Sequence, residues 1–178
     1  MTRLMCPILF AAMTALPVQP QAPAAPPPPV TTIILVRHAE AVTGAGADPV
    51  LSDAGIARAV ALAEALKDAG VTAVITTQYR RTVLTGEPLA AAAKAPLVST
   101  PVQGALDGHV RDIVQLVHAK HAGGTIVIVG HSNTIPALVK GLSGADVGEI
   151  AHDAYGHLFV VTTDTPGTGR VVRARYGA

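Results

Sequence analysis

The sequence has few of the residues that mark several common classes of protein. Its 178 residues contain no Trp and a single Cys, and only 14% of them are charged. One cysteine cannot form an internal disulfide, so a disulfide-bonded scaffold is excluded. The net charge of +1 excludes the strongly basic surface typical of nucleic-acid-binding domains. Any attraction for an anionic ligand must therefore be local.

The residues that are abundant favour one globular domain. Hydrophobic residues make up 49% of the chain. A chain of this length has room for a substantial core, and its low charge and high apolar content are not those of a disordered protein.

The N-terminus resembles a secretory signal. Arg3 provides a positive charge, Leu4 to Leu16 is mostly apolar, and Ala22-Pro23-Ala24 offers small residues for cleavage. The apolar run is shorter than the about 20 residues that span a bilayer, and Pro7 interrupts it. We therefore expect export to the periplasm or the extracellular space, with no stable membrane span in the mature form.

Three segments follow from this reading. Residues 1–24 are the expected signal peptide, residues 25–30 a Pro-rich linker, and residues 31–178 the functional domain. The linker should be extended and semi-rigid, because proline-rich segments favour the polyproline conformation.

Apolar runs alternate with helical patterns along the domain. We expect strands at 31–36, 71–76, 97–98 and 125–129, helices at 52–70, 79–93, 110–119 and 134–140, and a closing hairpin formed by 157–163 and 170–176. Such alternation predicts an α/β fold, a three-layer sandwich with a mostly parallel central sheet, helices on both faces and an antiparallel C-terminal edge.

Charged and imidazole side chains follow three of these strands. Arg37 and His38 end the first, Arg81 follows the second, and His131 follows the strand at 125–129. Ligands of such sheets bind beyond the carboxyl ends of the strands, so these side chains should converge. Two histidines and two arginines suit a phosphoryl group and a nitrogen nucleophile.

Four motifs carry a family resemblance. They are Arg37-His38-Ala39-Glu40, Leu51-Ser52-Asp53-Ala54-Gly55, the stretch from Thr77 to Glu87, and Gly130-His131-Ser132-Asn133. In this order they resemble the motifs of the histidine phosphatase superfamily, which includes the phosphoglycerate mutases. The resemblance covers residues 32 to 163. It implies the small single-domain branch that is similar to phosphohistidine phosphatases.

The resemblance and the chemistry together assign roles. His38 is the expected nucleophile, Arg37 and Arg81 the phosphoryl clamp, and His131 a hydrogen-bond donor to the phosphoryl group. The family spacing, measured from Thr77 and Thr85, selects Arg81 rather than Arg80. Ala39 stands where the family motif has glycine, which is tolerable if the backbone there is not left-handed.

A general acid is harder to assign. The best carboxylate in the expected region is Asp107, but the usual glutamate spacing is not reproduced. Asp107 is therefore either the acid or an ordinary turn residue. The acid is dispensable if the leaving group needs little protonation, as in a phosphohistidine or an acyl phosphate. Glu40 either forms an ion pair with Arg37 or another base, or is simply exposed.

The sequence predicts a metal-independent phosphatase that needs no cofactor. A pair of metal ligands at His118 and His121 is disfavoured because no matching ligand set is visible. The expected partner is a small phosphorylated metabolite or a phosphoprotein, not a nucleic acid. Two alternatives stay open: phosphoglycerate mutase-type phosphotransfer, and a module that binds phosphate or phosphoproteins without turnover.

Overall fold

The computed structural model describes residues 26–177. The expected signal peptide, residues 1–24, lies outside the described residues. Of the expected linker, residues 26–30 are described, and they are exposed and have no regular secondary structure. None of the helices in the described part of the chain has the length and apolar composition that crossing a bilayer requires.

Six strands form one mixed sheet. They are β1 (Thr31–Arg37), β2 (Val71–Thr76), β3 (Leu97–Ser99), β4 (Thr125–Gly130), β5 (His157–Thr163) and β6 (Arg170–Arg175). The order across the sheet is β3-β2-β4-β1-β5-β6. Strands β3, β2, β4 and β1 are parallel to one another, and β5 and β6 form an antiparallel edge beside β1.

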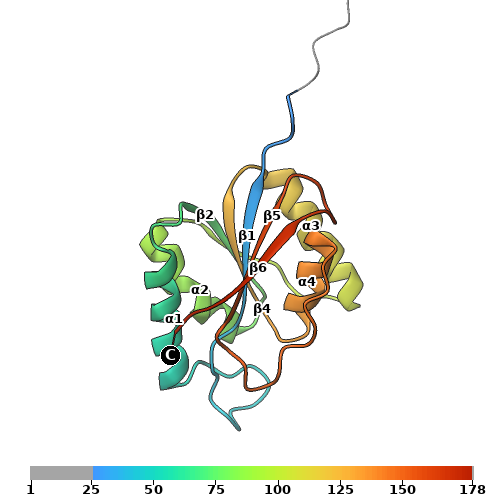
Figure 1. The fold of residues 1–178 in the computed structure, drawn as a ribbon. Coiled ribbons are helices and arrows are strands. Elements are labelled where there is room, and N and C mark those ends of the chain that lie inside the picture. Colours follow the sequence, from blue (N-terminus) through green and yellow to red (C-terminus); the bar gives the residue numbers. More distant parts are fainter. Residues whose placement is uncertain (1–25, 178) are drawn as a thin grey trace, which may run out of the picture.

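Four helices cover the two faces of the sheet (Figure 1). They are α1 (Asp53–Leu66), α2 (Arg80–Ala93), α3 (Leu106–Lys120) and α4 (Thr134–Ser143). Helices α1 and α2 lie on one face, and α3 and α4 lie on the other. The three-layer sandwich expected from the sequence is confirmed, including its antiparallel C-terminal edge.

The run of apolar residues in β1 is explained by burial on both faces. Ile33 and Leu35 belong to the core cluster that includes residues of α3 and α4. Ile34 and Val36 belong to a second cluster, with residues of α1 and α2. Successive side chains of a strand point to opposite faces, so a strand between two helical layers must be apolar at every position.

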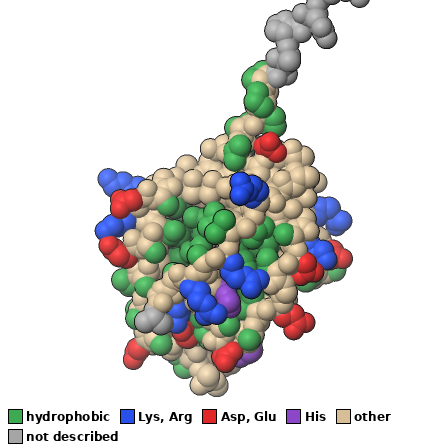
Figure 2. Space-filling model, in the orientation of Figure 1, with side chains coloured by type: hydrophobic (Ala, Val, Ile, Leu, Met, Phe, Trp, Pro, Cys, Tyr) green, Lys and Arg blue, Asp and Glu red, His purple; other side chains and the backbone are tan. Residues whose placement is uncertain are grey.

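Most element bounds agree with the sequence patterns to within a few residues. The largest differences are at helix ends: α1 ends at Leu66 rather than near Gly70, and α3 begins at Leu106 rather than Val110. Helix α2 continues through Pro88 to Ala93. Charged side chains of both signs are dispersed around an apolar area on the face shown in Figure 2, in line with the small net charge.

Gly55 allows α1 to start against the segment that follows β1. The N-cap residue Ser52 donates its backbone N–H to the Glu40 carbonyl at 2.9 Å, and its hydroxyl accepts the Gly55 N–H at 3.2 Å. A Cβ at Gly55 would lie 2.0 Å from the Glu40 carbonyl oxygen. The glycine of this motif is thus required by a backbone contact two residues from His38.

We expect Gly55→Ala to lower the free energy of unfolding by about 2–3 kcal/mol, because the backbone contact cannot yield without displacing α1. Gly108→Ala is a matched control: Gly108 is also the third residue of its helix, but an added Cβ would have no neighbour closer than 3.9 Å. This control should be neutral or stabilising by about 0.5–1 kcal/mol. Urea unfolding measures both, and equal effects would contradict the steric account.

Candidate active site

Three parallel strands bring the motif residues to one edge of the sheet. Arg37 of β1 is in register with Gly130 of β4, and Thr76 of β2 is in register with Val129. His38, His131 and Thr77 each follow the end of one of these strands. The His38 backbone N–H also donates to the Gly130 carbonyl at 2.9 Å, so the ladder extends to the first histidine.

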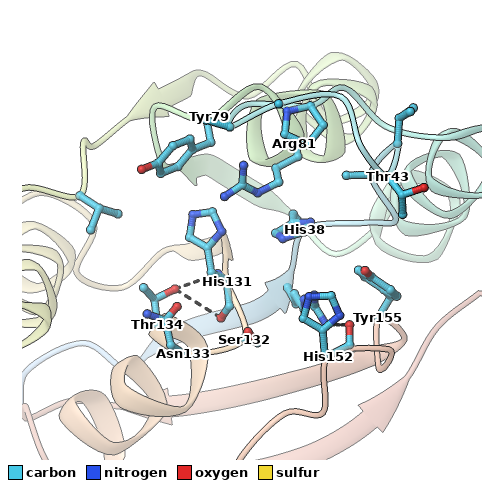
Figure 3. Close-up of a pocket in the computed structure, with 17 residues that line it drawn as sticks. His38, Thr43, Tyr79, Arg81, His131, Ser132, Asn133, Thr134, His152 and Tyr155 are labelled. Carbon is cyan, nitrogen blue, oxygen red and sulfur yellow. Dashed lines mark hydrogen bonds between the residues drawn. The ribbon is translucent and has the colours of Figure 1, made fainter.

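A cleft of about 560 Å3 opens at this edge (Figure 3). It is lined by Arg37, His38, Ala41, Val42, Thr43, Gly46, Ala47, Pro49, Tyr79, Arg81, Val102, His131, Ser132, Asn133, Thr134, His152 and Tyr155. Four of the five predicted site residues therefore line one cleft. The fifth, Asp107, does not.

His38 has a defined tautomer. The residue is only 7% exposed, and Nδ1 lies 2.8 Å from the Ala39 carbonyl oxygen. A carbonyl can only accept a hydrogen bond, so Nδ1 carries the hydrogen. In the neutral ring the lone pair is then on Nε2. A nitrogen with a free lone pair is what nucleophilic attack on phosphorus requires.

Burial keeps this imidazole neutral. Burial lowers the pKa of His38 to about 4, and the positive charges of Arg37 and Arg81 act in the same direction. The hydrogen bond to Ala39 opposes the shift but does not cancel it. A protonated histidine beside two guanidinium groups is electrostatically unfavourable. His38 is therefore unprotonated throughout the neutral pH range.

Ala39 ties the end of β1 to α2. Its backbone N–H donates to the Thr85 hydroxyl at 2.9 Å, and that hydroxyl donates to the Arg81 carbonyl at 2.7 Å. Ala39 is fully buried, and its backbone is not left-handed; among the described residues other than glycine, only Lys94 has a positive φ. The alanine in place of the motif's glycine therefore causes no backbone strain.

Arg37 is held on one side by a loop from a distant part of the chain. The residue is 3% exposed, and Nη1 donates to the carbonyls of Ala151 and His152 at 3.1 and 2.7 Å. Its guanidinium carbon lies 4.1 Å from the centroid of the Tyr155 ring. Burial lowers the pKa of Arg37, but a guanidinium stays charged in proteins.

Arg81 enters the cleft from the first turn of α2. Nη1 lies 3.8 Å from a carboxylate oxygen of Asp48, and the guanidinium lies 4.4 Å from the Tyr79 ring centroid. Arg80 is exposed and does not line the cleft; its backbone N–H donates to Asp48 at 2.9 Å. The structure thus brings Arg81, and not Arg80, to the two histidines.

His131 faces His38 across the cleft, with the ring centroids 5.4 Å apart. Its Nε2 is hydrogen-bonded to the Thr77 hydroxyl at 3.1 Å, and Thr77 in turn contacts the Thr82 hydroxyl at 2.9 Å. Burial lowers the pKa of His131 to about 3, with His38 and Arg81 contributing. Both rings are therefore neutral at pH 7.

Asp107 lies outside the cleft. It is exposed in the first turn of α3 and borders a separate hollow with Val110 and Arg111. The buried side of α3 is formed by His109, Ile113 and Val117, which recur every four residues. Asp107 is two positions from His109, about 200° around the helix, so it faces away from the core. The structure does not place it near His38.

Among the described residues that line the cleft, none is Asp or Glu. Asp48 is nearby, but its carboxylate already accepts the Arg80 amide and contacts Arg81. Glu40 forms a bidentate ion pair with Arg58, with distances of 2.8–2.9 Å, so the ion-pair alternative for Glu40 holds with Arg58 as the base. No group of three or more potential metal ligands occurs in the described part of the chain.

Sequence reasoning missed several residues of the cleft. Tyr155 and His152 come from the loop before β5, Tyr79 precedes α2, and Asp48 lies beside the cleft in the loop after β1. Tyr79 falls within the motif that runs from Thr77 to Glu87, but that motif assigned it no role. The other three belong to no motif, so the sequence carried no signal for them.

Comparisons with known proteins find a matching family model and similar folds. The model of the histidine phosphatase superfamily, branch 1, matches residues 33–102. A proposed phosphohistidine phosphatase, SixA, from Nakamurella multipartitia is 25% identical, with a TM-score of 0.64 over 86% of this chain and 100% of its own. The sequence has no significant match among curated proteins.

Two further structures share the fold at lower identity. The protein histidine phosphatase SixA complexed with tungstate is 18% identical, with a TM-score of 0.66 over 81% of this chain and 96% of its own. A mycobacterial glucosyl-3-phosphoglycerate phosphatase is 15% identical, with a TM-score of 0.68 over 83% and 100%. The resemblance found in the sequence is confirmed by the family model that matches residues 33–102 and by the fold that these structures share.

The protonation state of His38 can be measured directly. We expect its imidazole signals to titrate with a midpoint near pH 4 in the folded protein, because burial and two arginines disfavour the charged ring. Histidine side-chain NMR gives this midpoint, with His38→Gln assigning the signal. The same ring in urea-unfolded protein should titrate near the unperturbed value of about 6.5. A midpoint near 6.5 in the folded state would contradict the electrostatic account.

Proposed function

We propose that this protein is a phosphatase that acts through a phosphohistidine intermediate on His38. In the first step Nε2 attacks phosphorus, a nitrogen–phosphorus bond forms, and the bond between phosphorus and the leaving group breaks with its electron pair on the leaving group. In the second step water attacks phosphorus, an oxygen–phosphorus bond forms, and the nitrogen–phosphorus bond breaks with its electron pair returning to Nε2. Inorganic phosphate leaves, a proton of the water passes to solvent, and His38 is regenerated.

The observation that carries the proposal is the hydrogen bond from His38 Nδ1 to the Ala39 carbonyl. It fixes the lone pair on Nε2 in a ring whose pKa is lowered to about 4. A histidine with a purely structural role needs neither a fixed tautomer nor a lowered pKa. It also needs no pair of arginines beside it. An unprotonated nitrogen between two guanidinium groups is suited to attack an anionic phosphoryl group.

Arg37 and Arg81 would bind the phosphoryl oxygens and stabilise the charge that develops on them in the transition state. His131 would donate a third hydrogen bond. We propose that Thr77 donates to His131 Nε2, which leaves the ring hydrogen on Nδ1 in the neutral form. Thr77 would thereby set the tautomer that makes His131 a donor.

The lack of a lining carboxylate bears on the substrate. An alkoxide leaving group needs a proton in the transition state, whereas an imidazole or a carboxylate leaves more easily. We propose that the substrate is a phosphohistidine, on a protein or a small molecule, or an acyl phosphate. The match to a proposed phosphohistidine phosphatase supports the first of these.

The two other readings are less well supported. A phosphoglycerate carries a carboxylate besides its phosphoryl groups, but Arg37 and Arg81 are the only Lys or Arg side chains among the described residues that line the cleft. A module that only binds phosphate would not need a neutral nucleophile. Export to the periplasm or beyond stays a prediction that rests on residues 1–24.

The proposal is tested by turnover of acetyl phosphate and para-nitrophenyl phosphate in the presence of a metal chelator. We expect the wild type to hydrolyse both and His38→Ala to lose at least about 1000-fold in kcat, because the covalent route is removed. The control is His121→Ala, at the end of α3 and outside the cleft.

Two results would contradict the proposal. One is near-wild-type turnover by His38→Ala. The other is tight binding of inorganic phosphate by the wild type without turnover of either substrate, which would favour the binding module. Trapping with labelled substrate under alkaline conditions, in which phosphohistidine persists, should place the label on His38.

The position of Asp107 gives a second test. We expect Asp107→Asn to leave kcat/KM within twofold for both an alkyl phosphate and para-nitrophenyl phosphate, because its side chain does not line the cleft. The wild type itself should depend steeply on leaving-group pKa, since no lining carboxylate donates a proton. A selective loss on the alkyl phosphate in Asp107→Asn would reinstate Asp107 as the general acid.

A further inference from the structure

The cleft holds two of the chain's three tyrosines, and each lies against one arginine and one histidine. The ring centroid of Tyr155 lies 4.1 Å from the guanidinium carbon of Arg37 and 6.1 Å from the ring centroid of His38. The ring centroid of Tyr79 lies 4.4 Å from the guanidinium carbon of Arg81 and 5.3 Å from the ring centroid of His131. The two halves of the cleft repeat one arrangement.

The two tyrosines come from separate elements of the fold. Tyr79 is the N-cap residue of α2 but makes no capping hydrogen bond with its side chain. Tyr155 lies in the loop before β5, far from Tyr79 in the sequence. Figure 3 shows the two rings on opposite sides of His38 and His131. Both tyrosines are only partly buried, so neither is explained by packing in the core.

Other contacts restrain the two arginines incompletely. On Arg37, both hydrogen bonds to backbone carbonyls start from Nη1, and two bonds from one nitrogen leave the tilt of the guanidinium plane less defined. On Arg81, the ion pair with Asp48 is long, at 3.8 Å, and the residue is partly exposed. A tyrosine ring beneath each guanidinium supplies a planar surface and a favourable electrostatic contact.

We infer that Tyr155 and Tyr79 are paired positioning residues that orient Arg37 and Arg81 for a tetrahedral oxyanion. The rings act through the arginines. The hydroxyl of Tyr155 adds a second, smaller contribution, because it also favours the charged form of Arg37 and raises its pKa. The role in catalysis rests on the proposed phosphatase function, but the role in oxyanion binding does not. A test by binding therefore separates the two.

The test is the affinity for tungstate, a tetrahedral oxyanion, measured by calorimetry on the full chain. Tyr79→Phe keeps the ring and should bind within about twofold of wild type, and Tyr155→Phe should lose clearly less affinity than Tyr155→Leu. Tyr155→Leu and Tyr79→Leu remove the ring and should each weaken binding by about 3- to 30-fold, the range that corresponds to a partly buried cation–π contact. Urea unfolding should show that all four variants are folded.

Double mutants show whether each ring acts through its arginine. In an Arg37→Ala background, Tyr155→Leu should weaken tungstate binding by less than twofold further, while Tyr79→Leu keeps its effect. An Arg81→Ala background should give the reverse. A general structural role of either tyrosine would not produce this crossed pattern, because the loss would persist in both backgrounds.

Three outcomes would overturn the inference: wild-type affinity in both Leu variants, losses in the Phe variants equal to those in the Leu variants, or additive losses in both arginine backgrounds. The second would assign the effect to the hydroxyl groups. If either Leu variant fails to fold, Met at the same position tests the same loss of the ring. A wild type that binds tungstate but hydrolyses nothing would remove the proposed function and leave this inference standing.

Discussion

The parallel pairing of β1 with β4 is the constraint on which the cleft depends. Its register sets Arg37 beside Gly130, and the His38 amide extends the ladder by donating to the Gly130 carbonyl. Both histidines therefore leave the sheet at one level. Glycine is needed at 130, because a Cβ there would lie 2.6 Å from the Thr134 hydroxyl, which accepts the His131 amide. A shift of register by one residue would turn these side chains to the opposite face.

Electrostatics and burial act together at this edge. Placing imidazoles beside Arg37 and Arg81 would be costly if the rings were charged, and their burial makes the charged form less stable still. Arg37 and Arg81 thus place positive charge beside two neutral rings. Their field can act on an anion in the cleft while His38 stays neutral. A chain whose net charge is only +1 therefore still presents a local positive field in the cleft.

The fold and the centre of the cleft could be predicted because their signals are local. A run such as Ile33 to Val36 is apolar at successive positions because both faces of the strand are covered, and a polar side chain directly after such a run lies at the edge of the sheet. Tyr155 could not be found in this way. It reaches Arg37 through tertiary contacts across more than a hundred residues, and nothing in the sequence near it encodes that approach.

Asp107 illustrates the opposite error, in which a residue of suitable chemistry lies near the expected place in the sequence. Its orientation depends on where α3 begins, and helix ends are the bounds that sequence patterns locate least well. Once α3 starts at Leu106 with His109, Ile113 and Val117 inward, the carboxylate must face away from the sheet edge. What remains around His38 is a cleft that Arg37, Arg81 and His131 line without a carboxylate, and on the proposed function such a cleft would favour bonds that break without an acid. The proposed phosphatase would then be limited on the leaving-group side, whereas the residues proposed as nucleophile and clamp all line the cleft.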